Sequence, residues 1–226
     1  MQTTYPIIMF DRHLIIEHQG LKVLVDTGNP ATIGSMDSFE LMGEHHQCMK
    51  NIGGLEVKDV SELLGFNIDV LMGMDLIEQY YVMTDYQNKE ITFSTDTIPF
   101  QPIDSQRLLR GAMGMVCLEL NVKGQEVKLA LDTGAKISYI DQSLTHGEKA
   151  VGEEDDFYPM IGHFKTPVYA MEATVGNQSF PVNFGTLPTM LAMSLQLMGI
   201  EGAIGFDLFN AYKVLMDFKS NLMHLG

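Results

Sequence analysis

The tripeptide Asp26-Thr27-Gly28 recurs as Asp132-Thr133-Gly134, 106 positions further along the chain. Each copy directly follows a short apolar run, residues 21–25 (LKVLV) in the first case and 127–131 (VKLAL) in the second. Runs of this length and composition are typical of buried strands, and a glycine after them favours a turn. The sequence therefore predicts two equivalent strand–turn units, and such an internal repeat indicates a duplicated architecture.

A second repeat follows each tripeptide. Residues 71–76 (LMGMDL) match residues 203–208 (AIGFDL), and the similarity continues into a polar turn and a final apolar strand. The offset is now 132, because the second copy carries a longer middle segment. Each half is thus predicted to contain a strand, a glycine turn, a variable middle, an apolar-apolar-Gly stretch, a short helix and a closing hairpin.

These repeats predict a mainly β protein with short helices, built from two pseudo-two-fold related lobes. We expect the first half to span residues 1–100 and the second half residues 111–226, with residues 101–110 as a linker. Pro99 and Pro102 disfavour regular structure around that linker. The segments that favour a helix are Leu76–Gln79, Leu208–Ala211 and the methionine-rich Met190–Met198, the last predicted to be buried core or pocket wall.

Composition narrows the functional classes. The chain has 226 residues, of which 46% are apolar and 19% charged, as in an ordinary globular protein. Its net charge of −15 argues against nucleic acid as a partner, since phosphate binding requires clustered Lys and Arg. No apolar run approaches the roughly 18 residues of a membrane helix. Without a recognisable secretory signal, and with two cysteines, a cytoplasmic protein is expected.

The two aspartates suggest a specific chemistry. Duplicated halves tend to pack about a two-fold axis, which would bring the equivalent loops, and hence Asp26 and Asp132, side by side. Two carboxylates within about 3 Å do not both ionise readily, so they share one proton. The ionised member can accept a proton from water while the protonated member hydrogen-bonds a substrate carbonyl. The glycines Gly28 and Gly134 would let the backbone approach the carboxylates.

The paired strand-Asp-Thr-Gly and apolar-apolar-Gly motifs resemble those of the aspartic proteases, both pepsin-like and retropepsin-like. Residues 70–76 (VLMGMDL) and 82–86 (VMTDY) look most like bacterial retropepsin-like domains. The resemblance implies two β-rich lobes with an active cleft between them and no metal or cofactor. Retropepsins assemble from two identical chains, whereas pepsins hold both motifs in one chain. This sequence resembles retropepsin-sized lobes fused in the pepsin manner, which implies a monomer.

The same resemblance assigns roles to individual residues. Asp26 and Asp132 would be the catalytic pair, and Thr27 and Thr133 would form interlocking hydrogen bonds. Beneath the catalytic loops would lie two further glycines, Gly73 and Gly205.

The family covers its cleft with a glycine-containing hairpin, the flap, and two segments compete for this role. Both lie about 25 to 30 residues after an aspartate. The longer middle of the second half accommodates a full hairpin more easily, so we favour the second segment. The candidate residues are Ile52, Gly53 and Gly54 in the first half, and Met160, Ile161, Gly162 and Phe164 in the second.

Other features carry less information. Asn29 departs from the Ser, Thr or Ala that usually follows the family's tripeptide, and its amide would alter the hydrogen bonding of Asp26. The stretch His45–Cys48 has poor spacing for metal ligands and is expected to be a loop. The acidic run Glu153–Asp156 is expected to be solvated.

The leading hypothesis is a single-chain aspartic endopeptidase that binds an extended peptide or protein substrate. The alternative is a catalytically weak or inactive relative that binds peptides in the same cleft.

Overall fold

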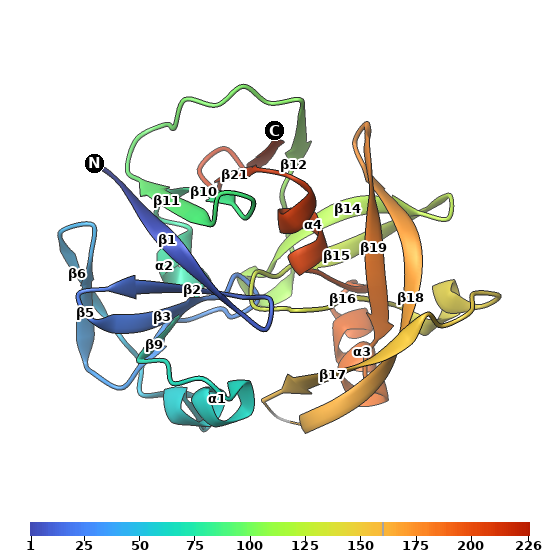
Figure 1. Ribbon diagram of the computed structural model, residues 1–226, viewed down its shortest axis with the longest axis horizontal. Helices are drawn as coiled ribbons and strands as arrows, with labels where there is room; N and C mark the ends of the chain where they lie inside the picture. The colour runs from blue at the N-terminus through green and yellow to red at the C-terminus, as the bar shows by residue number, and fades with distance from the viewer. Residues whose placement is uncertain (160) are drawn as a thin grey trace.

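The structure is a computed structural model that describes residues 1–159 and 161–226. Strands are the main secondary structure of the described chain and are accompanied by a few short helices (Figure 1). The first half lies on the left of the view, in blue to green, and most of the second half on the right, in light green to orange. The predicted mainly β class is therefore confirmed.

One sheet has ten strands and includes elements from both halves. Its spatial order is β12 (Asp104–Arg107), β22 (Leu222–Leu225), β21 (Val214–Asp217), β10 (Tyr81–Asp85), β11 (Glu90–Ser94), β1 (Gln2–Phe10), β2 (His13–His18), β3 (Leu21–Val25), β9 (Val70–Met72) and β4 (Ile33–Gly34).

The second sheet has eight strands, all from residue 109 onward. Its order is β13 (Leu109–Arg110), β14 (Val116–Val122), β15 (Gln125–Leu131), β20 (Gly202–Ile204), β16 (Ser138–Ile140), β19 (Gln178–Thr186), β18 (Gly162–Val175) and β17 (Gly152–Tyr158). An additional pairing of β14 with β18 curls this sheet back on itself.

The remaining elements are small. Two hairpins lie outside the large sheets, β5 (Ser38–Leu41) with β6 (Glu44–Gln47) and β7 (Asn51–Ile52) with β8 (Leu55–Glu56). The helices are α1 (Val57–Leu64), α2 (Met74–Ile77), α3 (Thr189–Leu197) and α4 (Phe206–Ala211), with 3₁₀ turns η1 (Ala112–Gly114) and η2 (Gln142–Thr145).

The repeated motifs occupy equivalent places. Strand β3, which precedes the first tripeptide, runs parallel to β9, with Val25 opposite Met72. Strand β15, which precedes the second, runs parallel to β20, with Leu131 opposite Ile204. Both pairs are buried, as expected of parallel strands in a core. Each aspartate therefore begins its loop at the end of a rigid strand.

The closing hairpins of the two halves join the molecule along its middle. Strand β10 of the first half pairs antiparallel with β21 of the second, and Val82 lies opposite Met216. Both side chains are buried in a hydrophobic core that includes residues of both halves. The halves are thus held together by main-chain hydrogen bonds as well as by a shared core.

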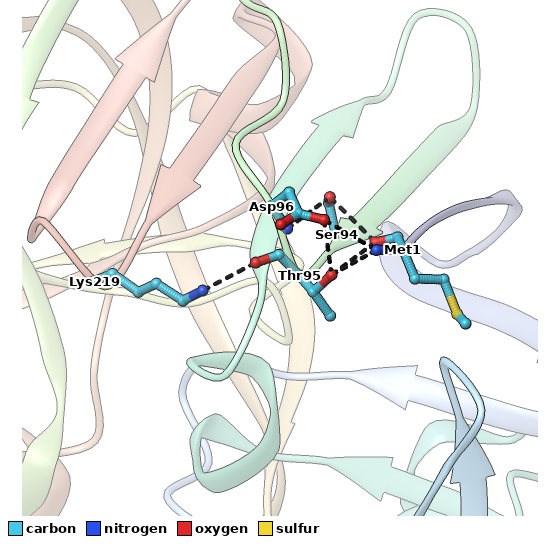
Figure 2. A network of polar contacts seen from close by, with 5 residues as sticks. All are labelled: Met1, Ser94, Thr95, Asp96 and Lys219. Atoms are coloured by element: carbon cyan, nitrogen blue, oxygen red, sulfur yellow. Dashed lines mark hydrogen bonds and ion pairs between the residues drawn. The ribbon is translucent and has the colours of Figure 1, made fainter.

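Polar contacts around Met1 reinforce this junction (Figure 2). The amino group of Met1 lies 2.6 Å from the Thr95 hydroxyl and 3.1 Å from a carboxylate oxygen of Asp96. From the β21–β22 turn, Lys219 donates a hydrogen bond to the Thr95 carbonyl at 3.0 Å. The start of β1, the end of β11 and the last hairpin therefore meet at one point.

Several local expectations are corrected. The linker 101–110 is not irregular, because it contains β12 and β13, which pair with β22 and β14 respectively. The segment 45–48 is not a loop for most of its length, since it supplies β6. In Met190–Met198, Met190 and Met193 are exposed, so this stretch is not simply core.

Helix α1 was not predicted, although its ends carry recognisable signals. Glu56 donates its backbone N–H to the Asp59 carboxylate at 2.8 Å in a capping box, and Gly65 ends the helix with a φ of 70°. The buried residues Val57, Val60 and Leu64 lie on one face. Among the described residues, no helix has the length and apolar character needed to cross a membrane.

Candidate active site

The loops after β3 and β15 lock into each other through their threonines. The backbone N–H of Thr133 donates to the Thr27 hydroxyl at 2.9 Å, and that of Thr27 donates to the Thr133 hydroxyl at 3.1 Å. Each hydroxyl in turn donates across the axis, from Thr27 to the Leu131 carbonyl at 2.7 Å and from Thr133 to the Val25 carbonyl at 2.8 Å. Both threonines are buried, so these bonds are shielded from water.

This exchange of hydrogen bonds brings the two aspartates together. Within each loop, the glycine N–H donates to its own aspartate, from Gly28 to Asp26 at 2.8 Å and from Gly134 to Asp132 at 2.9 Å. The two carboxyl groups are close enough for each to influence the pKa of the other. The loops that follow the two repeated strands therefore meet, with Asp26 and Asp132 beside each other.

Each glycine also lies against the opposite carboxyl group. A Cβ atom at Gly28 would lie 2.4 Å from Oδ2 of Asp132, and one at Gly134 would lie 2.5 Å from Cγ of Asp26. Both distances are far below van der Waals contact. No residue with a side chain fits at either position unless the carboxyl groups move apart.

The environment of the pair favours a bound proton. Burial raises the pKa of Asp26 well above its usual range, and the adjacent charge of Asp132 raises it further. Burial also raises the pKa of Asp132. Because the groups are adjacent, they titrate as one unit that retains a proton above the pH at which an isolated aspartate loses it.

Asn29 and Ala135 play equivalent backbone roles. The N–H of each donates to the carbonyl of the aspartate three residues earlier, at 3.3 Å in both loops. Their carbonyls accept hydrogen bonds from Met74 at 2.8 Å and Phe206 at 3.1 Å. The Asn29 group that acts on the Asp26 carboxyl is the backbone N–H, which lowers its pKa, rather than the side-chain amide.

Two further glycines lie beneath the loops. A Cβ at Gly73 would lie 2.5 Å from the Ala31 carbonyl, and one at Gly205 would lie 2.3 Å from the Ala135 carbonyl oxygen. The apolar-apolar-Gly segments therefore pass so close to the loops that follow Asp26 and Asp132 that only glycine fits.

A hydroxyl–carboxylate pair supports each of these crossings, and sequence reasoning did not identify it. In the first half, the Thr32 hydroxyl accepts from the Gly73 N–H at 3.0 Å and donates to Asp75 at 2.7 Å.

In the second half, the Ser138 hydroxyl accepts from the Gly205 N–H at 3.2 Å and donates to Asp207 at 2.6 Å. The signal was present in the repeat. Thr32 and Ser138 are separated by 106 positions, and both carry hydroxyl groups.

The flap candidates of the second half lie in a long hairpin formed by β17 and β18. Ile161 closes its turn by donating to the Tyr158 carbonyl at 2.8 Å, and Gly162 has a φ of 83°. Phe164 lies against Tyr139, with ring centroids 6.3 Å apart. Met160 lies outside the described residues.

Tyr158 lies at the end of β17, next to the turn of this hairpin. Its pKa is raised by burial and by the charges of Asp132 and Asp26. The side chain is 38% exposed, so the end of the hairpin remains in contact with solvent.

The first-half candidates form a much smaller structure. Gly53 and Gly54 make the turn of the β7–β8 hairpin, with φ values of 60° and 92°, and Ile52 precedes them. Each strand of this hairpin has two residues, and β8 leads directly into α1. The middle segments of the two halves therefore differ: the first forms a short hairpin followed by a helix, and the second forms a long hairpin.

The acidic run Glu153–Asp156, which was expected to be solvated, is solvated except at Asp156. It forms most of β17, where strand alternation exposes Glu153 and Asp155 and turns Glu154 and Asp156 inward. Asp156 is 6% exposed and accepts a hydrogen bond from the Tyr139 hydroxyl.

Comparison with known proteins supports the fold. No protein-family model matches the chain, and no curated protein has a significantly similar sequence. Among solved structures, the protease of Simian Foamy Virus (mac) is 18% identical and covers 35% of this chain and 94% of its own, but the TM-score of 0.27 carries no weight.

The crystal structure of an aspartic proteinase from Irpex lacteus matches far more extensively. It is 10% identical, covers 100% of this chain and 97% of its own, and has a TM-score of 0.56. The chain therefore has the two-lobed β fold of the pepsin-like aspartic proteinases.

Proposed function

We propose that the protein is an aspartic endopeptidase that hydrolyses peptide bonds through Asp26 and Asp132. The observation that carries the proposal is the pair of carboxyl groups held face to face by reciprocal threonine hydrogen bonds. Structural similarity to aspartic proteinases supports peptide hydrolysis as the reaction class.

The chemistry follows from a pair that shares one proton. The ionised carboxylate accepts a proton from water as the water oxygen attacks the substrate carbonyl carbon, and the protonated carboxyl donates its proton to the carbonyl oxygen. The tetrahedral gem-diol then collapses. The pair donates a proton to the leaving nitrogen, accepts one from a hydroxyl of the intermediate and returns to its starting state. Carboxylic acid and amine are the products.

The substrate would bind as an extended peptide beneath the β17–β18 hairpin, with main-chain hydrogen bonds to its strand edges. Ile161 and Phe164 would provide apolar contacts to substrate side chains. Because both aspartates belong to one chain, the site is complete in a monomer, and sedimentation at several concentrations tests that state.

The test is cleavage of a diverse peptide mixture from pH 3 to 7, read by mass spectrometry. The native chain should cut, whereas Asp132→Asn should not, since an amide accepts no proton from water. The exposed Asp155→Asn is the matched control. Equal cleavage by native protein and Asp132→Asn contradicts the proposal.

The alternative, a peptide-binding protein with little or no activity, is favoured by one difference between the halves. The first half has a hairpin with two-residue strands where the second has β17–β18. This alternative predicts peptide binding that Asp26→Asn leaves unchanged, with no turnover at any pH in the range.

A further inference from the structure

Three consecutive residues at the β1–β2 turn of the first half reach across to the second half. The Asp11 carboxylate lies 2.7 Å from the ammonium of Lys136, whose side chain is 10% exposed. Arg12 contacts the Glu154 carboxylate at 3.2 Å. The ring of His13, itself buried, stacks on Phe157 with centroids 5.8 Å apart and planes inclined by 21°.

The partners of this turn belong to two functional parts of the second half. Lys136 is four residues after Asp132, in the segment that leaves the catalytic loop. Glu154 and Phe157 lie on β17, one strand of the long hairpin. The turn therefore holds the catalytic loop and the hairpin at the same time.

Phe157 fastens the hairpin to the first half at a second place. Its side chain packs against the hydrophobic cluster that contains Val57, Val60 and Leu64 of α1. In Figure 1 the β17 end of the hairpin points towards α1, across the space between the halves. Phe157 therefore connects β17 both to His13 and to this cluster of the first half.

The two charged residues of this turn adopt a left-handed backbone conformation that is unfavourable for residues with side chains. Phe10 pairs with His13, so Asp11 and Arg12 form a two-residue hairpin loop, and their φ values are 44° and 67°. Such loops favour Asn-Gly, because a left-handed conformation costs little there. Asp11 and Arg12 lack the conformational advantage of Asn-Gly, but their side chains make the contacts between the halves.

A buried polar group completes the cluster. Asp156 accepts a hydrogen bond from Tyr139, and its 6% exposure removes it from solvent. Burial raises the pKa of Asp156, and the charges of Lys136 and His13 oppose that rise. The inward face of β17 is therefore matched in polarity to the surface it covers.

We propose that Asp11 and Arg12 are positioning residues that clamp the second half against the first: Arg12 holds the β17–β18 hairpin through Glu154, and Asp11 holds the segment after Asp132 through Lys136. Opening of the hairpin then requires contacts between the two halves to break, rather than bending within one half. The consequence for substrate binding rests on the proposed function, whereas the clamp itself can be measured without a substrate.

The chain contains no tryptophan, so one introduced indole provides a clean probe. Phe157→Trp places it on the hairpin at the contact with His13. Added to this background, the pair Asp11→Asn with Arg12→Gln should raise the acrylamide quenching constant at least threefold, because the indole spends more time exposed. Tyr158→Trp provides a second reporter if Phe157→Trp does not fold.

The matched control is Lys165→Gln, which removes ion pairs to Glu153 and Asp155 within the same hairpin. It should leave quenching unchanged. Exchange of charges in Arg12→Glu with Glu154→Arg should return the quenching raised by Arg12→Glu alone towards the parent value. Natively folded Asp11→Asn with Arg12→Gln and unchanged quenching would overturn the clamp.

Activity provides a separate readout on the chain without the probe. Asp11→Asn with Arg12→Gln should raise KM at least fivefold and leave kcat within about twofold, because substrate binding must now also close the hairpin. Increased quenching without any peptide cleavage retains the clamp and rejects the proposed function. Peptide cleavage with unchanged quenching supports the proposed function and rejects the clamp.

Discussion

Thr27 and Thr133 exchange hydrogen bonds, since the backbone N–H of each donates to the side-chain hydroxyl of the other. The two residues are 106 positions apart, yet neither loop can move without breaking a buried bond in the other. The spacing of the two carboxyl groups therefore depends on two hydroxyl groups that are not themselves charged.

Replacing either threonine by alanine should destabilise the protein. Thr27→Ala removes the acceptor of the Thr133 N–H and leaves that buried donor unpaired, at a cost of about 1–3 kcal/mol. Urea unfolding measures this change. Thr27→Ser retains the hydroxyl and should lose much less stability. Equal losses for Ala and Ser would mean that the threonine methyl group, and not the hydrogen bond, is responsible.

Gly28→Ala should abolish peptide cleavage, because its Cβ would lie 2.4 Å from Oδ2 of Asp132. The carboxyl groups would have to separate, and a displacement of about 1 Å can reduce a rate by about 100-fold. Gly152→Ala is the control, since a Cβ there meets no atom within 4 Å. Unchanged kcat/KM in Gly28→Ala would show that the pair tolerates separation.

The aspartate pair should make stability depend on pH with a defined sign. Burial raises the pKa of Asp26 in the folded protein, so its contribution to stability is complete below the usual aspartate pKa of about 3.9. That contribution is lost as the pH rises through the raised pKa.

Asp26→Asn has no carboxyl group to ionise at this position. Its melting temperature relative to the native chain should therefore increase between pH 4 and 7. Asp155→Asn, an exposed substitution, should show a smaller trend. A melting-temperature difference that stays flat or falls with pH would contradict the assigned sign.

Thr32→Val should weaken the support beneath the first loop. The lost hydroxyl accepts from the Gly73 N–H and donates to Asp75, so the buried Gly73 N–H is left without its acceptor, while the exposed Asp75 can bind water instead. We expect a loss of about 1–3 kcal/mol in unfolding free energy. Ser138→Ala should behave similarly in the second half. Thr32→Ser should stay close to the native stability, which separates the hydroxyl from the methyl group.

Removal of the hydroxyl from two buried tyrosines should have different effects on the stability of the fold. Within the described residues the Tyr86 hydroxyl has no hydrogen-bond partner, whereas that of Tyr139 donates to Asp156. Tyr86→Phe should be neutral or stabilise the fold by about 1 kcal/mol, and Tyr139→Phe should destabilise it by about 1–3 kcal/mol. Chemical denaturation of both variants checks the contrast; destabilisation by Tyr86→Phe would indicate that its hydroxyl is paired.

The sequence by itself determined the elements that are local and repeated. The Asp-Thr-Gly turns follow apolar strands, and the second repeat relates Gly73 to Gly205. Both patterns can be recognised in the sequence because each involves only a few adjacent residues. Thr32 and Ser138 share the 106-residue offset of the repeat, but neither was identified from the sequence, and their support of the glycine crossings emerged only from the structure. Helix α1 also carried local capping signals that hydrophobic periodicity alone did not reveal.

Only the tertiary structure decided which distant groups meet. Asp11 and Lys136 are 125 positions apart, and no local pattern relates them. The acidic residues of β17 read as a solvated run, yet Asp156 is buried because strand pairing turns every second side chain inward. Contacts of this kind depend on how the two halves pack, and that packing is set by the shared core and by the β10–β21 pairing, which no short segment of the chain encodes.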